Sequence, residues 1–337
     1  MTHHTQALDR IGPDCAPGAL RACEHFSALW HGLLLTSAKR TQEEMAVKLV
    51  TFAAGGQETP GLIDPHDETR VLDLTPVVGE RSLLAVVEEW DTLGPQIADA
   101  RDLPAVIDPA LRAPFPVPRR DLFAVGKNYR EHVAEFGRSG YDTPQRSEDL
   151  PDKPIVFSKA TTSVTGPYDD VEAHAGITDE LDYESELAVI IGRGGRGIAY
   201  DDALEHVWGY TIVNDVTARD VQRDHKQWLL GKSLDTHAPM GPWAVTADEV
   251  GDVTALEVSS SVNGEPRQKA PVADLIFDVP ELIRVISAGI TLLPGDVIAT
   301  GTPAGVGIGF DPPRFLQPGD VVECAITGLG ALRNTIR

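Results

Sequence analysis

The sequence predicts a mixed α/β fold that is rich in strands, with a small α+β domain ahead of a larger one. The chain has 337 residues, which suits two domains, and 42% of them are apolar, which is sufficient for a packed core. Short apolar stretches between turn residues dominate from residue 121 onwards. The proline-rich run APFPVPRR, at residues 113–120, separates this part from the residues before it.

The residues before that run divide in two. Met45 begins the strand-like segment MAVKLVTFA, so we expect residues 1–44 to be an N-terminal extension, mostly mobile, with one helix over residues 19–40. An ordinary helix packed on the body is the alternative. Residues 45–117 then form the small domain, with strands at 48–53, 60–64 and 71–75 and an amphipathic helix at 81–93.

Residues 118–337 form the larger domain. Period-2 or continuous apolar patterns predict its strands at residues 121–126, 154–158, 184–192, 209–215, 242–246, 256–264, 296–302 and 320–330. Helices are fewer and are expected around residues 129–136, 202–207, 218–229 and 279–287. The chain has no internal repeat of 20–50 residues.

The charge of the chain is strongly negative, and it excludes several classes of partner. There are 51 Asp and Glu against 29 Lys and Arg, a net charge of −22. Such a field repels nucleic acids and anionic membrane surfaces, and it repels anionic substrates unless a cation reverses the local potential. The three cysteines fit no disulfide scaffold, and neither a signal peptide nor a transmembrane segment is recognisable. We therefore expect a soluble, cytoplasmic protein.

Carboxylates gather at two predicted strands. Glu184 and Glu186 are two residues apart, so they project to the same face of a strand, and Asp215 ends another strand. A solvated strand face would explain the pair, but the following LAVII enters a core. Carboxylates that share a cation form an all-oxygen site suited to Mg²⁺, Mn²⁺ or Ca²⁺.

Two further patterns suggest acid–base chemistry. His132 and Glu135 are three apart on a predicted helix, where a carboxylate behind an imidazole raises its basicity, although a surface pair would look the same. Lys232, at the end of a helix, is suited to hold a substrate carboxylate or an enolate. The GKS that contains Lys232 lacks the upstream glycine of a phosphate loop.

The segment GRGGRG fits a dinucleotide-binding motif through Gly192, Gly194 and Gly197. An NAD-dependent dehydrogenase using residues 192–197 is therefore one hypothesis. However, the first strand of such a domain is buried on both faces, whereas this one carries Glu184 and Glu186. A simple glycine-rich turn is the better interpretation, and we expect no nucleotide cofactor.

Seven motifs together resemble one known family. In order they are GKNYREHVAEFG, DYESELAVIIG, GYTIVNDVTARDVQ, QWLLGKSLDTHAPMGP, VNGEPRQ, LLPGDVIATGTPAGVG and GLGALRNTI. Over residues 118–337 this pattern is similar to the fumarylacetoacetate hydrolase superfamily. It resembles most the proteins named for containing a fumarylacetoacetate hydrolase domain, and the bacterial members that resemble 2-hydroxyhepta-2,4-diene-1,7-dioate isomerase. The resemblance implies a β-roll catalytic domain, and residues 45–117 resemble the small N-terminal domain of bacterial members.

The resemblance also implies roles for individual residues. Glu184, Glu186 and Asp215 would bind one Mg²⁺ or Mn²⁺, and His132 with Glu135 would activate water while Lys232 stabilises charge. The residues implied to bind substrate are Arg219, Gln222, Thr302 and Lys159. Two departures concern the substrate: residues 137–154, where the family has a lid, are longer than expected, and His237 replaces an expected aromatic residue.

The function implied is a metal-dependent hydrolase that cleaves a carbon–carbon bond in an acylpyruvate-like or β-diketo acid, through an enolate, in carbon catabolism. The same site would serve an oxaloacetate decarboxylase or tautomerase, or a 2-hydroxyhepta-2,4-diene-1,7-dioate isomerase. A metal-binding member without activity is a further alternative, which the intact His132, Glu135 and Lys232 disfavour. The implied partner is a small anionic 2-oxo or 1,3-dioxo acid, and the implied assembly is a homodimer.

Overall fold

The computed structural model describes residues 47–138 and 150–337. The predicted extension at residues 1–44, with its helix at 19–40, lies outside the described residues, and so does most of the predicted lid. Residues 46–337 group into one compact unit.

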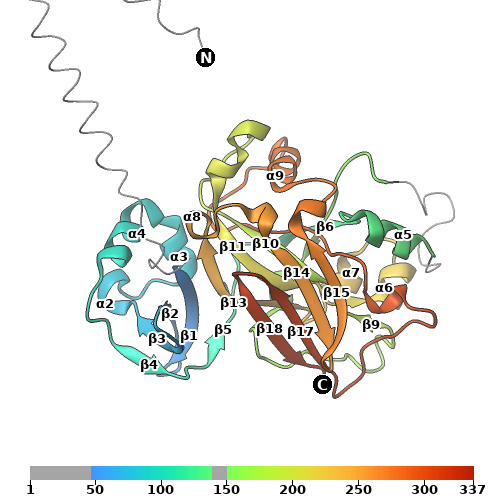
Figure 1. The fold of residues 1–337 in the computed structure, drawn as a ribbon, viewed down its shortest axis with the longest axis horizontal. Helices are drawn as coiled ribbons and strands as arrows, with labels where there is room; N and C mark the ends of the chain where they lie inside the picture. Colours follow the sequence, from blue (N-terminus) through green and yellow to red (C-terminus); the bar gives the residue numbers. More distant parts are fainter. Residues whose placement is uncertain (1–46, 139–149) are drawn as a thin grey trace, which may run out of the picture. The chain divides into compact units, whose positions relative to one another are not determined.

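A twelve-stranded sheet dominates this unit (Figure 1). Its strands run in the order β4 (Ala105–Ile107), β3 (Asp67–Asp73), β2 (Gln57–Asp64), β1 (Lys48–Ala54), β13 (Ala238–Thr246), β11 (Val207–Asn214), β10 (Ser185–Ile191), β16 (Val297–Ala299), β6 (Leu122–Gly126) and β7 (Ile155–Lys159). Off this path, β5 (Leu111–Arg112) pairs with β1 and β8 (Val164–Thr165) pairs with β13. The strands predicted for the small domain thus continue into the sheet of the larger one, and the boundary at residue 117 remains a prediction.

The other strands form two smaller sheets. One has the order β15 (Glu265–Pro271), β14 (Glu257–Val262), β17 (Val321–Ile326) and β18 (Gly330–Thr335), and the other pairs β12 (Thr217–Ala218) with β9 (Leu181–Asp182). In Figure 1 the orange and red strands of the four-stranded sheet lie across β10 and β11, and β14 and β17 contact β10. Their alternating buried and half-buried residues are typical of strands with one face in a core.

Strand β10 shows why the centre of the large sheet is buried on both faces. Leu187 and Val189 belong to one apolar core, which includes the inner face of the four-stranded sheet. Ala188 and Ile190 belong to a second core, formed with the helices α2, α3 and α4. Because side chains alternate along a strand, β10 is apolar throughout after Glu186.

The helices are short and lie between the strands. The α-helices are α2 (Thr75–Val78), α3 (Leu83–Glu88), α4 (Trp90–Asp99), α5 (Arg130–Arg138), α6 (Arg219–Asp224), α7 (Leu229–Lys232), α8 (Ala247–Val250) and α9 (Val279–Ser287). The 3-10 helices are η1 (Thr161–Ser163), η2 (Tyr200–His206), η3 (Val253–Ala255), η4 (Val272–Asp274) and η5 (Gly307–Gly309).

Local sequence explains the best-predicted helix and the least well-predicted one. Helix α9 begins where Asp278 accepts a hydrogen bond from the backbone N–H of Glu281 at 2.9 Å, a regular N-cap. The helix predicted at residues 218–229 ends early: α6 stops at Asp224, Lys226 takes a positive φ of 60°, and the separate helix α7 begins only at Leu229. The mixed, strand-rich α/β fold that the sequence predicts is confirmed. Among the described helices, none is long and apolar enough to cross a membrane.

Candidate active site

The three carboxylates predicted to bind metal meet where β10 begins and β11 ends. These strands are antiparallel with Ser185 opposite Asn214, so the next residues outward, Glu184 and Asp215, also lie opposite each other. The backbone N–H of Asp215 donates to the carbonyl of Glu184 at 2.8 Å. One carboxylate oxygen from each of Glu184, Glu186 and Asp215 lies within 4.8 Å of the others, and all three residues are buried.

This cluster has the chemistry of a cation site. Burial, together with the neighbouring Asp215 and Glu184, raises the pKa of Glu186 well above its ordinary value. Three buried carboxylates so close together are unfavourable unless a positive charge is shared among them. A hard divalent cation with oxygen ligands satisfies that requirement, so the residues present fit Mg²⁺ or Mn²⁺.

Two lysines, Lys232 and Lys159, contact the same cluster. The Lys232 ammonium, at the end of α7, donates to Glu184 Oε2 at 2.9 Å and to Asp215 Oδ2 at 2.8 Å. Burial lowers the pKa of Lys232, but the attraction of Asp215 and Glu184 outweighs it, and the pKa is raised. Lys232 also lines the open cleft beside the carboxylates, which suits its predicted task.

Lys159 lies differently from its predicted place. It is wholly buried at the end of β7, and its ammonium donates to Asp215 Oδ1 at 2.6 Å, to the carbonyl of Val216 at 3.2 Å and to the carbonyl of Lys232. All three donors of an ammonium are thereby used. This position gives no support to substrate binding by Lys159; it suits the orientation of Asp215 instead.

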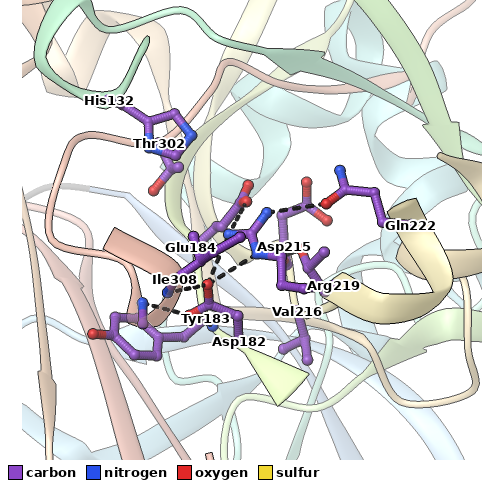
Figure 2. A network of polar contacts seen from close by, with 12 residues as sticks. His132, Asp182, Tyr183, Glu184, Asp215, Val216, Arg219, Gln222, Thr302 and Ile308 are labelled. Atoms are coloured by element: carbon purple, nitrogen blue, oxygen red, sulfur yellow. Dashed lines mark hydrogen bonds and ion pairs between the residues drawn. The ribbon is translucent and has the colours of Figure 1, made fainter. Parts of the chain in front are cut away.

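Arg219 and Gln222 lie on α6, beside Glu184 and Asp215 (Figure 2). Arg219 Nη2 lies 2.7 Å from Glu184 Oε1, and Nη1 donates to Gln222 Oε1 at 3.3 Å. Burial lowers the pKa of Arg219, but Glu184 and Asp182 outweigh it, so the guanidinium stays charged. Together with Lys232, it lowers the pKa of Glu184 against the opposing effect of burial.

The predicted His–Glu pair forms on α5. His132 Nδ1 lies 3.3 Å from Glu135 Oε2, as the three-residue spacing on a helix predicts. Glu135 also accepts a hydrogen bond from the backbone N–H of Gly305 at 3.0 Å. Both side chains are buried, and the imidazole borders the same cleft as Glu184 and Lys232.

One cleft unites most of the predicted residues. It is lined by Val125, Gly126, Lys127, His132, Phe136, Glu184, Arg219, Gln222, Trp228, Lys232 and Thr302. Four predicted residues do not line the cleft: Glu135, Glu186, Asp215 and Lys159. Each of them forms a hydrogen bond either to a residue that lines the cleft or to a sequence neighbour of such a residue. Residues from β6, α5, α6, α7 and the segment after β16 thus converge on one place.

Several residues of this site are absent from the sequence prediction. Gln268 donates to Thr302 Oγ1 at 2.6 Å, and Thr302 in turn donates to the carbonyl of Ser185 at 3.0 Å. Asp182 bonds to Arg219, and Trp228 forms a wall of the cleft. For Asp182 a signal was present, since it continues the alternation of Glu184 and Glu186. Gln268 and Trp228 lie within the motifs VNGEPRQ and QWLLGKSLDTHAPMGP, but their residue types alone indicate no role.

The glycine-rich loop at residues 192–197 has the wrong surroundings for a dinucleotide. It follows β10 and leads through the short 3-10 helix η2 into β11, which pairs with β10 in antiparallel register. A dinucleotide-binding turn requires a helix and a parallel second strand. The loop is a connection within an antiparallel pair.

Comparison with known proteins agrees with this architecture. The family described as "Fumarylacetoacetate (FAA) hydrolase C-terminal" matches residues 121–337. The chain belongs to the fumarylacetoacetate hydrolase family. It is 49% identical over 226 residues to the oxaloacetate tautomerase YisK of Bacillus subtilis. The aligned residues cover 67% of this chain and 72% of that protein.

Solved structures of family members are also similar. A fumarylacetoacetate hydrolase from Exiguobacterium antarcticum matches with a TM-score of 0.76 and 41% identity, over 87% of this chain and 99% of that one. A maleylpyruvate hydrolase from Sphingobium matches with a TM-score of 0.68 and 29% identity, over 86% of this chain and 98% of that one. The resemblance drawn from the seven motifs is therefore confirmed, and the protein is an enzyme of this family.

Proposed function

We propose that the protein is a metal-dependent enzyme that enolises a small anionic 2-oxo acid, with keto–enol tautomerisation of oxaloacetate as its reaction. The observation that carries this proposal is the cluster of three buried carboxylates beside one cleft, which Glu184 lines together with Lys232, Arg219 and His132. The 49% identity to a protein named as an oxaloacetate tautomerase supports the choice of substrate.

Different residues of the site would have different roles in such a reaction. A Mg²⁺ or Mn²⁺ ion at Glu184, Glu186 and Asp215 would supply the positive charge that attracts an oxo acid and makes the carbon beside its keto group more acidic. The ammonium of Lys232 and the guanidinium of Arg219 would bind negative charge as it develops on the substrate oxygen or carboxylate. Thr302 and Gln222 would orient the substrate through hydrogen bonds.

His132 would move the proton. Glu135 lies beside Nδ1 of the imidazole, so it would hold the tautomer in which Nε2 is free to accept. In tautomerisation Nε2 would take the proton from the carbon beside the keto group and deliver it to the enolate oxygen, which gives the enol, and the reverse transfers would give the keto acid.

Hydrolysis of a carbon–carbon bond is the second candidate, and the contact between His132 and Glu135 favours it. In this version His132 takes a proton from water, the hydroxide attacks the distal carbonyl of an acylpyruvate, and the carbon–carbon bond breaks. The electron pair of that bond passes to the leaving enolate, which is then protonated. Both reactions use the same enolate, so one site suits either.

A panel of substrates tests the proposal. Oxaloacetate, acetylpyruvate, fumarylpyruvate and a hydroxyheptadienedioate are each offered to the full chain with EDTA, Mg²⁺ or Mn²⁺. We expect the enol–keto exchange of oxaloacetate to be accelerated most, and only with metal. Turnover that is insensitive to the chelator, or a preference for acylpyruvate cleavage, contradicts the tautomerase proposal. Light scattering on the same sample tests the proposed homodimer.

A further inference from the structure

Asp182 collects more hydrogen bonds than its neighbours. It is wholly buried, and its carboxylate accepts hydrogen bonds from four N–H groups: the backbone of Tyr183 at 2.9 Å, of Gly307 at 2.6 Å and of Ile308 at 3.1 Å, and Nε of Arg219 at 2.9 Å. Nη2 of Arg219 lies 2.9 Å from the same carboxylate as an ion pair. Figure 2 shows this carboxylate between Arg219 and Ile308. Asp182 itself does not line the cleft.

On one side Asp182 holds Arg219. The guanidinium lies between the carboxylates of Asp182 and Glu184, with Nη2 within 2.9 Å of an oxygen of each. A buried guanidinium needs its counter-charges, since an unpaired buried charge is strongly unfavourable. The orientation of Arg219 toward Glu184 therefore depends on Asp182.

On the other side Asp182 holds residues 305–309, which we name the 305–309 turn. The N–H of Gly305 in this turn donates to Glu135, and the carbonyl of Gly305 accepts from the hydroxyl of Tyr183 at 2.8 Å. The turn also packs closely on α5: a Cβ at Gly309 would lie 1.9 Å from Glu135 Oε1. Any shift of the turn is thus transmitted to Glu135.

We propose that Asp182 is a positioning residue that couples Arg219 to the 305–309 turn, and thereby keeps the His132–Glu135 pair aligned with the carboxylates across the cleft. The proposal rests on the function proposed above for its kinetic consequence, but its structural consequence can be measured without a substrate. An aspartate is required because all four hydrogen-bond partners of its carboxylate are donors. An asparagine would turn its NH₂ group toward at least one of them.

Asp296 provides a matched control. It is also buried, accepts from Arg120 Nε at 2.9 Å and accepts from the backbone N–H of Leu293 at 2.7 Å, and neither Asp296 nor Arg120 lines the cleft. Asp296→Asn therefore removes the same kind of charge-assisted contact at a place with no proposed part in the reaction.

The experiment compares the full-length wild type, Asp182→Asn and Asp296→Asn, each with Mg²⁺. Hydrogen exchange is followed by mass spectrometry on peptides that contain the 305–309 turn and α5. In Asp182→Asn we expect exchange in both peptides to rise about 10- to 100-fold, the range for loss of a charge-assisted hydrogen bond. We expect kcat for oxaloacetate to fall about 100-fold, as small misplacements of catalytic groups do.

Asp296→Asn should lose thermal stability without either change. If Asp182→Asn behaves as Asp296→Asn does, in exchange and in kcat, the proposal is wrong. Tyr183→Phe serves if Asp182→Asn does not fold, because it removes only the hydroxyl that holds Gly305. It should raise exchange of the same two peptides about 2- to 10-fold, and unchanged exchange there overturns the coupling. A wild type without activity on the whole panel refutes the proposed function, whereas the exchange data judge Asp182 independently.

Discussion

Residues 47–117 and the described part of residues 118–337 differ in how many charged and polar side chains they bury. Among residues 47–117, the described polar side chains that are buried are Thr51 and Asp64 only. The core there is built from aliphatic and aromatic residues of β1 and of helices α2, α3 and α4. In the described part of residues 118–337, the buried charged side chains include Glu135, Lys159, Asp182, Glu184, Glu186, Asp215, Arg219, Lys232 and Asp296.

This difference in buried charge distinguishes side chains that stabilise the fold from side chains that are arranged for a function. Apolar burial stabilises a fold without any particular partner, at about 25 cal/mol for each Å² removed from water. A buried charge needs a specific counter-charge and adds little net stability even when paired. Apart from Asp296, these buried charges lie at or beside one cleft, so substitutions in the two regions should have different signatures.

The largest effects are expected at the proposed metal site, where Glu184→Gln and Glu186→Gln can be compared. Each removes a carboxylate, so each should weaken Mn²⁺ binding more than about 100-fold, beyond the effect of losing an outer hydrogen bond. Without metal they should differ. Glu184→Gln takes a partner from Lys232 and Arg219 and should destabilise the fold by about 1–3 kcal/mol, whereas Glu186→Gln relieves like-charge repulsion and should stabilise it.

Calorimetry with Mn²⁺ and urea unfolding in EDTA measure these quantities. Two variants with the same stability in EDTA would show that the cluster is not electrostatically asymmetric. Unaltered Mn²⁺ affinity in either one would place the cation elsewhere.

His132→Gln should separate the chemistry from the metal. The imidazole borders the cleft but lies outside the carboxylate cluster, so Mn²⁺ affinity should stay within about 2-fold of the wild type, a difference near 0.4 kcal/mol. Proton transfer should suffer, with kcat down by about 10²- to 10⁴-fold, the usual contribution of a general base. If tautomerisation persists while acylpyruvate hydrolysis is lost, His132 serves water activation alone.

The sequence predicts two pairs of neighbouring side chains in this site because the physics there is local. The two-residue period of a strand puts Glu184 and Glu186 on one face, and the three-residue spacing on a helix brings His132 to Glu135. The three carboxylates, the His–Glu pair, Lys232, Arg219, Gln222 and Thr302 all meet at this place, although their roles remain predictions.

What the sequence could not predict depends on distant segments. The partners of Lys159 are Asp215 and two carbonyls that come from residues 216 and 232, so its burial is set by tertiary packing. Asp182 continues the alternating carboxylates, but the strand is interrupted between β9 and β10. The side chain of Asp182 therefore contacts Arg219 and the 305–309 turn instead of the other carboxylates. Only the fold shows that this side chain accepts four hydrogen bonds.

In the apolar region, Leu74→Ala should change stability and leave the reaction alone. Leu74 is wholly buried in the core shared by α2, α3 and α4 with the sheet. Truncation should lower the free energy of unfolding by about 2–5 kcal/mol, measured by urea unfolding. At a temperature where the variant stays folded, kcat for oxaloacetate should match the wild type. A kcat that falls by the same factor as in His132→Gln would mean that the two regions are not separable.

The smallest effect concerns His237, a buried histidine of the larger region that lies outside the cleft. Its Nε2 lies 3.2 Å from the carbonyl of Glu172, and its ring stacks edge-on against His174 at 5.0 Å. Burial, and then the charge of Lys159, lowers the pKa of His237 from 6.5 to about 3. The folded protein therefore keeps this ring neutral between those values, while the unfolded chain takes up a proton.

Stability should accordingly fall as the pH falls from 6.5 toward 3, with this residue contributing a slope of at most about 1.4 kcal/mol per pH unit. His237→Phe removes the proton uptake, so its unfolding free energy should depend less steeply on pH in that window than that of the wild type. Above pH 7 the two proteins should show the same pH dependence, because His237 is neutral in both states. Parallel curves for the two proteins from pH 7 down to pH 4 would show that His237 is protonated in the folded protein, and that this region tolerates a buried positive charge outside the site as readily as within it.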